Sequence, residues 1–324
     1  MSTAYAFEIA CVKGVKNTRA SACNFDPKAI EMAVLLPKGT TFTQAQLLAI
    51  KATLLGLAKD DDKTARIYPI KRFTSVEDKS TDATYKEYDN GDRKKIRDGK
   101  YGWRFTYDEG GLALHTKIKT FDGKQDAFDV AFFDKNNGGL MMTSRDGITA
   151  KGFSLSMIDV PNYKQAGFSD PSEYFIEFGL ANSDEMNLYP IFVPFPDDFD
   201  GINDLNGLYD LEMSILTDMD NTGLFDLKLT AGNRAVDLYD DYNNVFDDTL
   251  LYDVTNAATG GSIAVTSITP TPATKSWAVQ LDGSDPNFPA AAGDLIKIAI
   301  GDVSDIESAG APGYGESEIV APRG

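Results

Sequence analysis

Short alternating segments separated by reverse-turn signals dominate the sequence from Arg66 onward. The run Tyr101-Gly-Trp-Arg-Phe-Thr-Tyr107 places large apolar side chains at every second position, which is the period of a half-buried strand. Turn sequences such as Asp89-Asn-Gly-Asp92 and Arg145-Asp-Gly147 lie between the runs and are typical of hairpins. The strands expected from these patterns cover residues 66–73, 84–88, 101–107, 127–133, 139–143, 148–158 and 174–178. The sequence therefore predicts a mainly β fold.

One amphipathic helix is expected beside the strands, from Thr43 to Lys59. Apolar side chains recur there at helical spacing, and Thr43 with Gln46 forms a capping-box pattern at the start. A second short segment, Gly111–Thr120, has the composition of either a helix or a strand. The fold class predicted is mainly β (α+β), with a helix flanking a β-sandwich or a barrel-forming sheet.

The length of 324 residues exceeds what one hydrophobic core usually organises, so two domains are expected. Residues 190–223 form an acidic stretch interrupted by three prolines, which we interpret as a partly extended connection with one strand near Leu208–Leu216. After Phe225 the chain becomes rich in Thr, Ala, Gly and Pro, with short strands expected at 262–268, 276–281 and 294–300. We therefore expect an assembling β domain over residues 1–224 and an immunoglobulin-like sandwich over residues 225–324.

The formal net charge of −18 is unevenly distributed along the chain. Residues 1–100 hold 18 basic and 13 acidic side chains, whereas residues 101–225 hold 8 and 21, and residues 226–324 hold 5 and 15. This balance argues against a nucleic-acid-binding protein, because phosphate binding depends on Lys and Arg. The uneven distribution of charge is explained either by solubility alone or by a contact between the basic end of one copy and the acidic face of another. Lys94, Lys95 and Arg97 are the candidate residues for that assembly contact.

Cellular location is suggested by the N-terminal sequence. Cys11 and Cys23 are the two cysteines, and they suit neither a disulfide scaffold nor a zinc site. Glu8 interrupts the first apolar run, so no signal peptide is expected. No window reaches the ~18 apolar residues that span a bilayer, so no membrane association is expected. These features predict a chain made in a reducing cytoplasm.

The sequence offers little for catalysis, and we expect a protein that is not an enzyme and needs no cofactor. His115 is the single histidine, and its neighbours form no catalytic signature, so we interpret it as structural. Neither a phosphate-binding loop nor a dinucleotide-binding fingerprint occurs. A pair of carboxylates for glycoside hydrolysis stays open as an alternative, since an acidic chain always supplies such residues.

Asp218, Asp220 and Thr222 open a segment that is similar to a calcium-binding loop, with oxygen-bearing side chains at alternate positions before Gly223. The twelfth position, which requires a bidentate glutamate, is Leu229. The segment is therefore either an ordinary acidic loop or a weak Ca²⁺ site. The second reading suggests an alternative function, a Ca²⁺-assisted module that binds carbohydrate or another cell-surface ligand.

Residues 100–188 resemble the tail tube (major tail) proteins of tailed bacteriophages in the order of their elements. The phrase Asp146-Gly-Ile-Thr-Ala-Lys-Gly-Phe-Ser154 and an alternating strand after it contribute to the resemblance. The other segments that carry it are Tyr101–Tyr107, Leu112–Phe121, Ala127–Phe133, Leu140–Thr143 and Glu173–Phe178. The C-terminal part is similar to the immunoglobulin-like additions found on phage structural proteins.

This resemblance implies a virion structural protein that is made in the cytoplasm of a bacterial host. Subunits of that family form hexameric rings, which stack into a tube, contact other virion proteins and conduct DNA without binding it specifically. An acidic lumen repels phosphates, so Asp122, Asp126, Asp129 and Asp134 are candidate lumen residues. A capsid or decoration protein shares the same assembly logic and stays open as an alternative.

Overall fold

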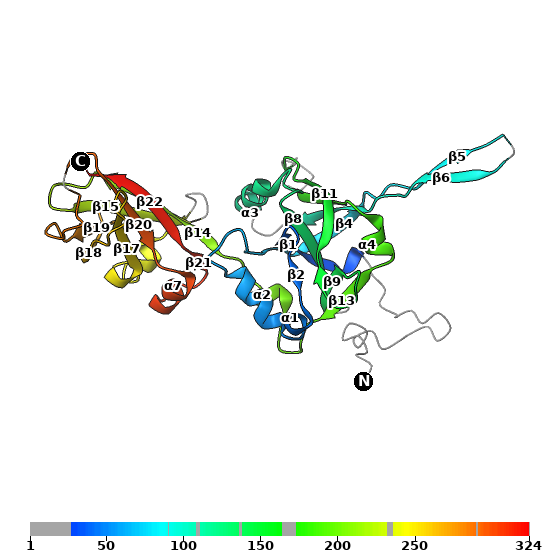
Figure 1. The fold of residues 1–324 in the computed structure, drawn as a ribbon, viewed down its shortest axis with the longest axis horizontal. Coiled ribbons are helices and arrows are strands. Elements are labelled where there is room, and N and C mark those ends of the chain that lie inside the picture. Colours follow the sequence, from blue (N-terminus) through cyan, green and yellow to red (C-terminus); the bar gives the residue numbers. More distant parts are fainter. Residues whose placement is uncertain are drawn as a thin grey trace, which may run out of the picture. The chain divides into compact units, whose positions relative to one another are not determined.

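The computed structural model describes residues 27–89, 91–107, 111–135, 138–163, 173–231, 236–289 and 291–323. Cys11, Cys23 and the N-terminal features discussed above lie outside these residues. The chain forms two compact units (Figure 1). The first comprises residues 1–58 and 62–206, and the second comprises residues 59–61 and 207–324.

The first unit is built on a sheet that has eleven strands within the described ranges. Its main path runs β2-β10-β9-β8-β11-β12-β7-β4, with β1 paired to β8, β3 paired to β1, and β13 paired to β9. The sheet divides at β8, because β9 and β11 pair with different halves of that strand. The strands are β1 (Ile30–Pro37), β2 (Thr41–Phe42), β3 (Tyr68–Lys71), β4 (Phe73–Asp78), β7 (Gly102–Tyr107), β8 (Phe128–Asp134), β9 (Gly139–Thr143), β10 (Ala150–Lys151), β11 (Phe153–Asp159), β12 (Tyr174–Leu180) and β13 (Pro190–Pro194).

Strand β1 is covered on both faces. Ala33 and Leu35 pack into an aromatic core that includes Phe105, whereas Met32 and Val34 pack into a second core on the other face. A strand buried on both faces is a continuous apolar run without alternation. For this reason β1 was not expected from its pattern.

The flanking helix is present, but it is divided into α1 (Gln44–Leu48) and α2 (Ile50–Ala58). Ala49 leaves helical geometry between them, with φ −107° and ψ 38°. The capping box is confirmed, since the Thr43 side chain accepts a bond from Gln46 N and the Gln46 side chain accepts one from Thr43 N. Leu54 and other apolar side chains of these helices cover the second core.

Other short helices complete the first unit. The ambiguous segment after Gly111 is helical, as α3 (Gly111–Ile118) followed by a 3-10 turn, η2 (Lys119–Phe121). The remaining elements are η1 (Pro27–Ala29), α4 (Ser183–Asn187) and α5 (Gly201–Asp204). A separate two-stranded hairpin of β5 (Thr84–Glu87) and β6 (Arg93–Arg97) continues the β4–β7 ladder.

The second unit consists mainly of two sheets. One has the order β18-β19-β15-β14-β21 with β16 beside β15, and the other has the order β17-β20-β22. Its strands are β14 (Tyr209–Thr217), β15 (Leu224–Ala231), β16 (Val236–Asp237), β17 (Tyr252–Asn256), β18 (Val265–Thr271), β19 (Ser276–Leu281), β20 (Leu295–Ile300), β21 (Tyr314–Gly315) and β22 (Ser317–Pro322). Its helices are α6 (Tyr239–Tyr242), η3 (Thr249–Leu251) and α7 (Val303–Ala309).

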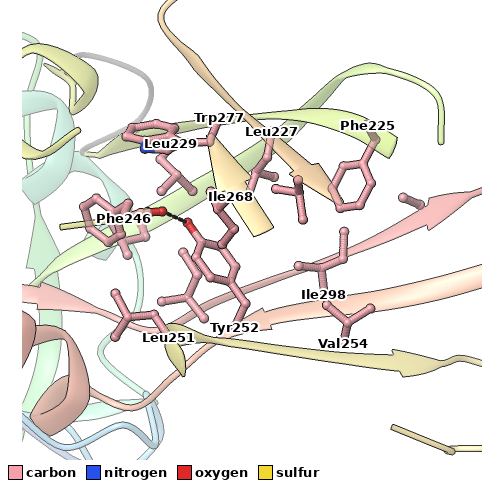
Figure 2. Packing of buried hydrophobic residues seen from close by; sticks show 14 of the residues in the cluster. Phe225, Leu227, Leu229, Phe246, Leu251, Tyr252, Val254, Ile268, Trp277 and Ile298 are labelled. Carbon is pink, nitrogen blue, oxygen red and sulfur yellow. Dashed lines mark hydrogen bonds between the residues drawn. The ribbon is translucent and has the colours of Figure 1, made fainter. Parts of the chain in front are cut away.

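One hydrophobic core joins these two sheets (Figure 2). Trp277 and Leu227 come from the first sheet, and Val254 and Ile298 come from the second. Tyr252 is buried among them and donates a hydrogen bond of 2.9 Å from its hydroxyl to the Phe246 carbonyl. A buried hydroxyl needs such a partner, and burial also raises the pKa of Tyr252.

The second unit begins at Gly207, so the boundary expected near residue 224 is wrong by this division. Strands β14 and β15 pair on either side of it, from Leu211 with Ala231 to Thr217 with Asp226. The acidic 190–223 stretch is therefore not one connection, because β13 belongs to the first unit and β14 to the second. The expected fold class, mainly β with a flanking helix, is confirmed.

Candidate assembly surface

The β5–β6 hairpin, with its turn, is here called the arm (residues 84–97). In Figure 1 it extends outward from the body of the first unit. Every residue of its two strands is exposed, so no core lies beneath either face. The exposed residues include three large apolar side chains, Tyr85 (57% exposed), Tyr88 (41%) and Ile96 (62%).

The arm is attached through a narrow neck between β4 and β7. Thr81 and Lys100 exchange two backbone hydrogen bonds of 2.8 and 3.1 Å. The strands approach so closely there that a Cβ atom on Gly99 would lie 2.2 Å from the Thr81 carbonyl oxygen. At the far end, Tyr88 N donates to Asp92 O, and Gly91 adopts a positive φ of 84° that closes the turn.

The register of the arm sets two lysines against each other. Lys86 is directly opposite Lys94, and Tyr85 is directly opposite Lys95. Like charges directly opposite each other destabilise a strand pair. The Lys94 side chain makes no hydrogen bond or ion pair with any residue that the structure describes, so its charge is uncompensated among those residues.

The three candidate assembly residues, Lys94, Lys95 and Arg97, all lie on β6 of the arm. Lys95 pairs with Asp98, and Arg97 donates from Nε to Thr84 Oγ1 at 3.1 Å. The sequence thus located a basic segment but did not predict its form. Strand β6 was not expected, because a run of charged residues lacks the apolar alternation of a half-buried strand.

A second surface of the first unit lies along residues 193–203, which we call the cradle. It contributes to a shallow cavity of about 220 Å³ that is also lined by Leu47 and Leu48 of α1 and by Ile50 at the start of α2. It also contributes to a second cavity of about 480 Å³. That cavity is lined by Glu31, Lys135, Asp197 and Asp200 together with the rings of Phe133 and Phe199.

The cradle is held in shape by stacked rings. Phe195 stacks on Phe133 with ring centroids 5.2 Å apart. The Phe199 ring lies tilted against Phe195, with 4.7 Å between the two ring centroids. Gly201 is required beside them, because a Cβ atom there would lie 2.4 Å from the Phe195 ring. Asp200 caps α5 by accepting bonds from Ile202 N and Asn203 N. Between residues 194 and 203 the chain carries three aspartates and no basic residue.

Hydrogen bonds and an ion pair hold the segment Asp146–Ser154 in place. The Asp146 carboxylate accepts bonds from the Ile148 and Thr149 amides, and these bonds hold its pKa below the usual range. Lys151 forms an ion pair of 2.8 Å with the buried Glu185, which also accepts from Ser154 N. Burial favours the neutral form of Glu185, but these hydrogen bonds outweigh it and lower its pKa. Through Lys151 and Ser154, this segment links β10 and β11 to Glu185 of α4.

The candidate lumen residues differ in accessibility. Asp126 is exposed, and Asp122 is half-buried, accepting from Lys119 Nζ and Val160 N. Asp129 and Asp134 are each 1% exposed. Asp129 pairs with Lys38 at 3.0 Å, so its charge is balanced within the unit. The expectation that Asp129 and Asp134 line a lumen is therefore wrong, because their carboxylates are covered.

The calcium-like segment forms the turn between β14 and β15. Asp220 Oδ1 accepts from Thr222 N, Thr222 Oγ1 and Leu224 N at 2.7 to 2.9 Å. These bonds lower the pKa of Asp220 and use the oxygen that a cation would need. Asp218 is exposed beside the turn. Within the described parts of the chain, no group of three or more acidic, Cys or His side chains is placed to hold a metal ion.

His115 lies in a cluster of rings. It is 5% exposed and hydrogen-bonds through Nδ1 to the Tyr107 hydroxyl at 2.8 Å. The Tyr174 ring lies 5.5 Å away between centroids. Burial and the nearby Lys119 lower the pKa of His115, which keeps the ring neutral near pH 7. These contacts are those of a packed, satisfied core histidine.

Comparison with known proteins gives no relative for this chain. No protein-family model, curated protein or solved structure matches it. Over the residues described, every helix is too short or too polar to cross a bilayer.

Proposed function

We propose that this chain is a structural subunit that assembles with copies of itself, as a tail tube protein of a tailed bacteriophage. The arm is the observation that carries the proposal. An isolated two-stranded hairpin is only marginally stable in water, and this one exposes Tyr85 and Ile96 on its two faces and the opposed charges of Lys86 and Lys94 on one of them. Such a hairpin gains stability when another surface covers it.

Two further features support assembly between copies. The main path of the first sheet ends at β2 and at β4, which leaves strand edges where a neighbouring copy can pair. The net charge of −18 also favours passage of DNA over its retention. In this proposal the first unit forms the ring and the tube, and the second unit is an outward immunoglobulin-like domain.

The test is direct observation of the purified chain across a range of concentrations. Analytical ultracentrifugation should show concentration-dependent oligomers, and negative-stain microscopy should show rings or stacked tubes. Closed shells would instead favour the capsid alternative. A chain that stays monomeric at all concentrations and salt conditions overturns the proposal.

A further inference from the structure

We infer that the arm of one copy docks in the cradle of the next copy, with the basic strand β6 against the aspartates of residues 194–203. This inference rests on the proposed function, because it names the partner and the contact through which copies join. It commits to a second copy of this chain as the occupant of the cradle.

Charge complementarity is the first argument. Strand β6 carries four basic residues out of five, whereas residues 194–203 of the cradle carry three aspartates and no basic residue. Lys51 pairs with Asp198, and Lys135, which lines the second cavity, pairs with Glu31, so Asp197 is the exposed carboxylate that offers its charge to the arm. Lys86 and Lys94 repel each other in the free chain. A carboxylate between them removes that repulsion, so docking relieves a cost that the isolated arm carries.

Apolar complementarity is the second argument. The arm exposes Tyr85, Tyr88 and Ile96, and the cradle offers two shallow cavities with Leu48, Phe133 and Phe199 among their walls. Leu48 is 74% exposed at the rim. Aromatic side chains in apolar pockets supply most of the binding energy in protein interfaces, and the surrounding charges fix the register.

The geometry excludes docking within one molecule. In Figure 1 the arm leads away from β13 and α1, which bound the cradle. The arm and the cradle are also different surfaces, so the contact is heterologous and each copy keeps one arm and one cradle to offer. Repetition of such a contact closes a ring when the rotation between copies closes.

The experiment uses two reversals that touch exposed residues. The arm variant is Lys86→Glu with Lys94→Glu, and the cradle variant is Asp197→Lys with Asp198→Lys. The Asp198–Lys51 pair lost in the second variant is exposed and contributes little to stability. Each variant should raise the concentration for half-assembly at least about tenfold. Lys124→Glu, the same substitution at one exposed lysine outside the arm, is the control and should have no such effect.

Mixing the two variants identifies the contact. In an equimolar mixture the normal arm of the cradle variant fits the normal cradle of the arm variant, and the reversed arm fits the reversed cradle. The mixture should therefore co-assemble in ultracentrifugation at a concentration where neither variant assembles alone. A chain that carries all four reversals should regain assembly, because the charges are exchanged. Circular dichroism and thermal unfolding establish that each variant is folded.

The outcomes separate this inference from the function it rests on. If the wild type forms rings or tubes and both variants do so at the same concentration, the docking is wrong and the proposed function stands. If the mixture co-assembles but no ring or tube ever appears, for the mixture or for the wild type, the docking stands and the tail tube proposal is wrong. Failure of the mixture to co-assemble, while the wild type assembles, also overturns the docking.

Discussion

The backbone of Gly99 packs against the carbonyl of Thr81, with only 2.2 Å between that oxygen and the place where a Cβ atom would stand. This contact lies where the arm leaves the body. Gly99→Ala should therefore separate the two strands at the neck and misdirect the arm while the rest of the first unit remains folded.

The readouts for this variant are assembly by ultracentrifugation and folding by circular dichroism. We expect weaker assembly with near-normal secondary structure. Gly56→Ala is the matched control, because no atom lies within 4 Å of its added Cβ and α2 should gain up to about 1 kcal/mol. Equal assembly by both variants would show that the geometry of the neck is unimportant.

Lys86→Glu alone should change stability and assembly in opposite directions. It places a carboxylate opposite Lys94, which converts a repulsive cross-strand pair into an attractive one worth about 0.2–1 kcal/mol. Hydrogen exchange of the arm amides should become slower. Self-association should become weaker, because the arm loses a positive charge that faces the cradle.

Several elements of the first unit could be predicted from the spacing of apolar residues in the sequence, but the candidate surfaces could not. The helix near Thr43 and the strand Tyr101–Tyr107 were expected because apolar periodicity and a capping box are local signals. Strand β13 was not expected, because prolines at both ends suggested a connection. Proline is tolerated there because β13 pairs on one side only, with β9.

The cradle was beyond prediction for a different reason. Glu31, Phe133 and Asp197 meet at one cavity although they are far apart in the sequence. The periodicity of apolar residues along the sequence cannot predict such a contact, because the contact depends on how the strands are arranged in the sheet. The burial of Asp129 is another example, since its partner Lys38 comes from a distant segment.

Arg323 is expected to hold the C-terminal strand of the second unit in place. Its guanidinium donates to the Pro289 carbonyl and to Asn221 Oδ1, and it lies 5.2 Å from the centre of the Phe288 ring. Arg323→Ala should lower the free energy of unfolding of this unit by about 1–3 kcal/mol.

The two tryptophans make this measurement specific, because Trp103 lies in the first unit and Trp277 in the second. Denaturant unfolding followed by fluorescence in a Trp103→Phe background reports the second unit alone. Lys297→Ala removes an exposed cation of the same unit and should change its stability little. A midpoint for Arg323→Ala equal to that of Lys297→Ala would contradict the prediction.

The stability of the first unit should rise with pH above about 8 because of Lys71. Burial, reinforced by the neighbouring Arg72, lowers the pKa of Lys71 to about 8, although Asp200 and Asp204 oppose the shift. Between about 8 and the ordinary value of 10.5, the unfolded chain binds this proton and the folded chain does not. Unfolding is therefore disfavoured as the pH rises through that window.

The measurement is denaturant unfolding followed by Trp103 fluorescence at several pH values from 7 to 10. In a Trp277→Phe background this signal reports the first unit. Lys71→Met keeps the side-chain length but removes the titrating group and its bonds to Ile202 O and Asn206 Oδ1. The rise in stability should be absent from this variant, and an equal rise in both chains would assign it to other groups.

The lysines of the arm also have a consequence for the free chain. A flat, exposed hairpin has free edges that invite pairing with any other strand, which is how many β proteins aggregate. Four basic residues on β6 make edge-to-edge pairing of two arms repulsive, and the bulge between Thr84 and Tyr85 interrupts the flat edge. In the proposed assembly, the same charges select an acidic partner and keep free copies from pairing arm to arm, so the concentration of free copies can rise before an ordered structure begins to grow.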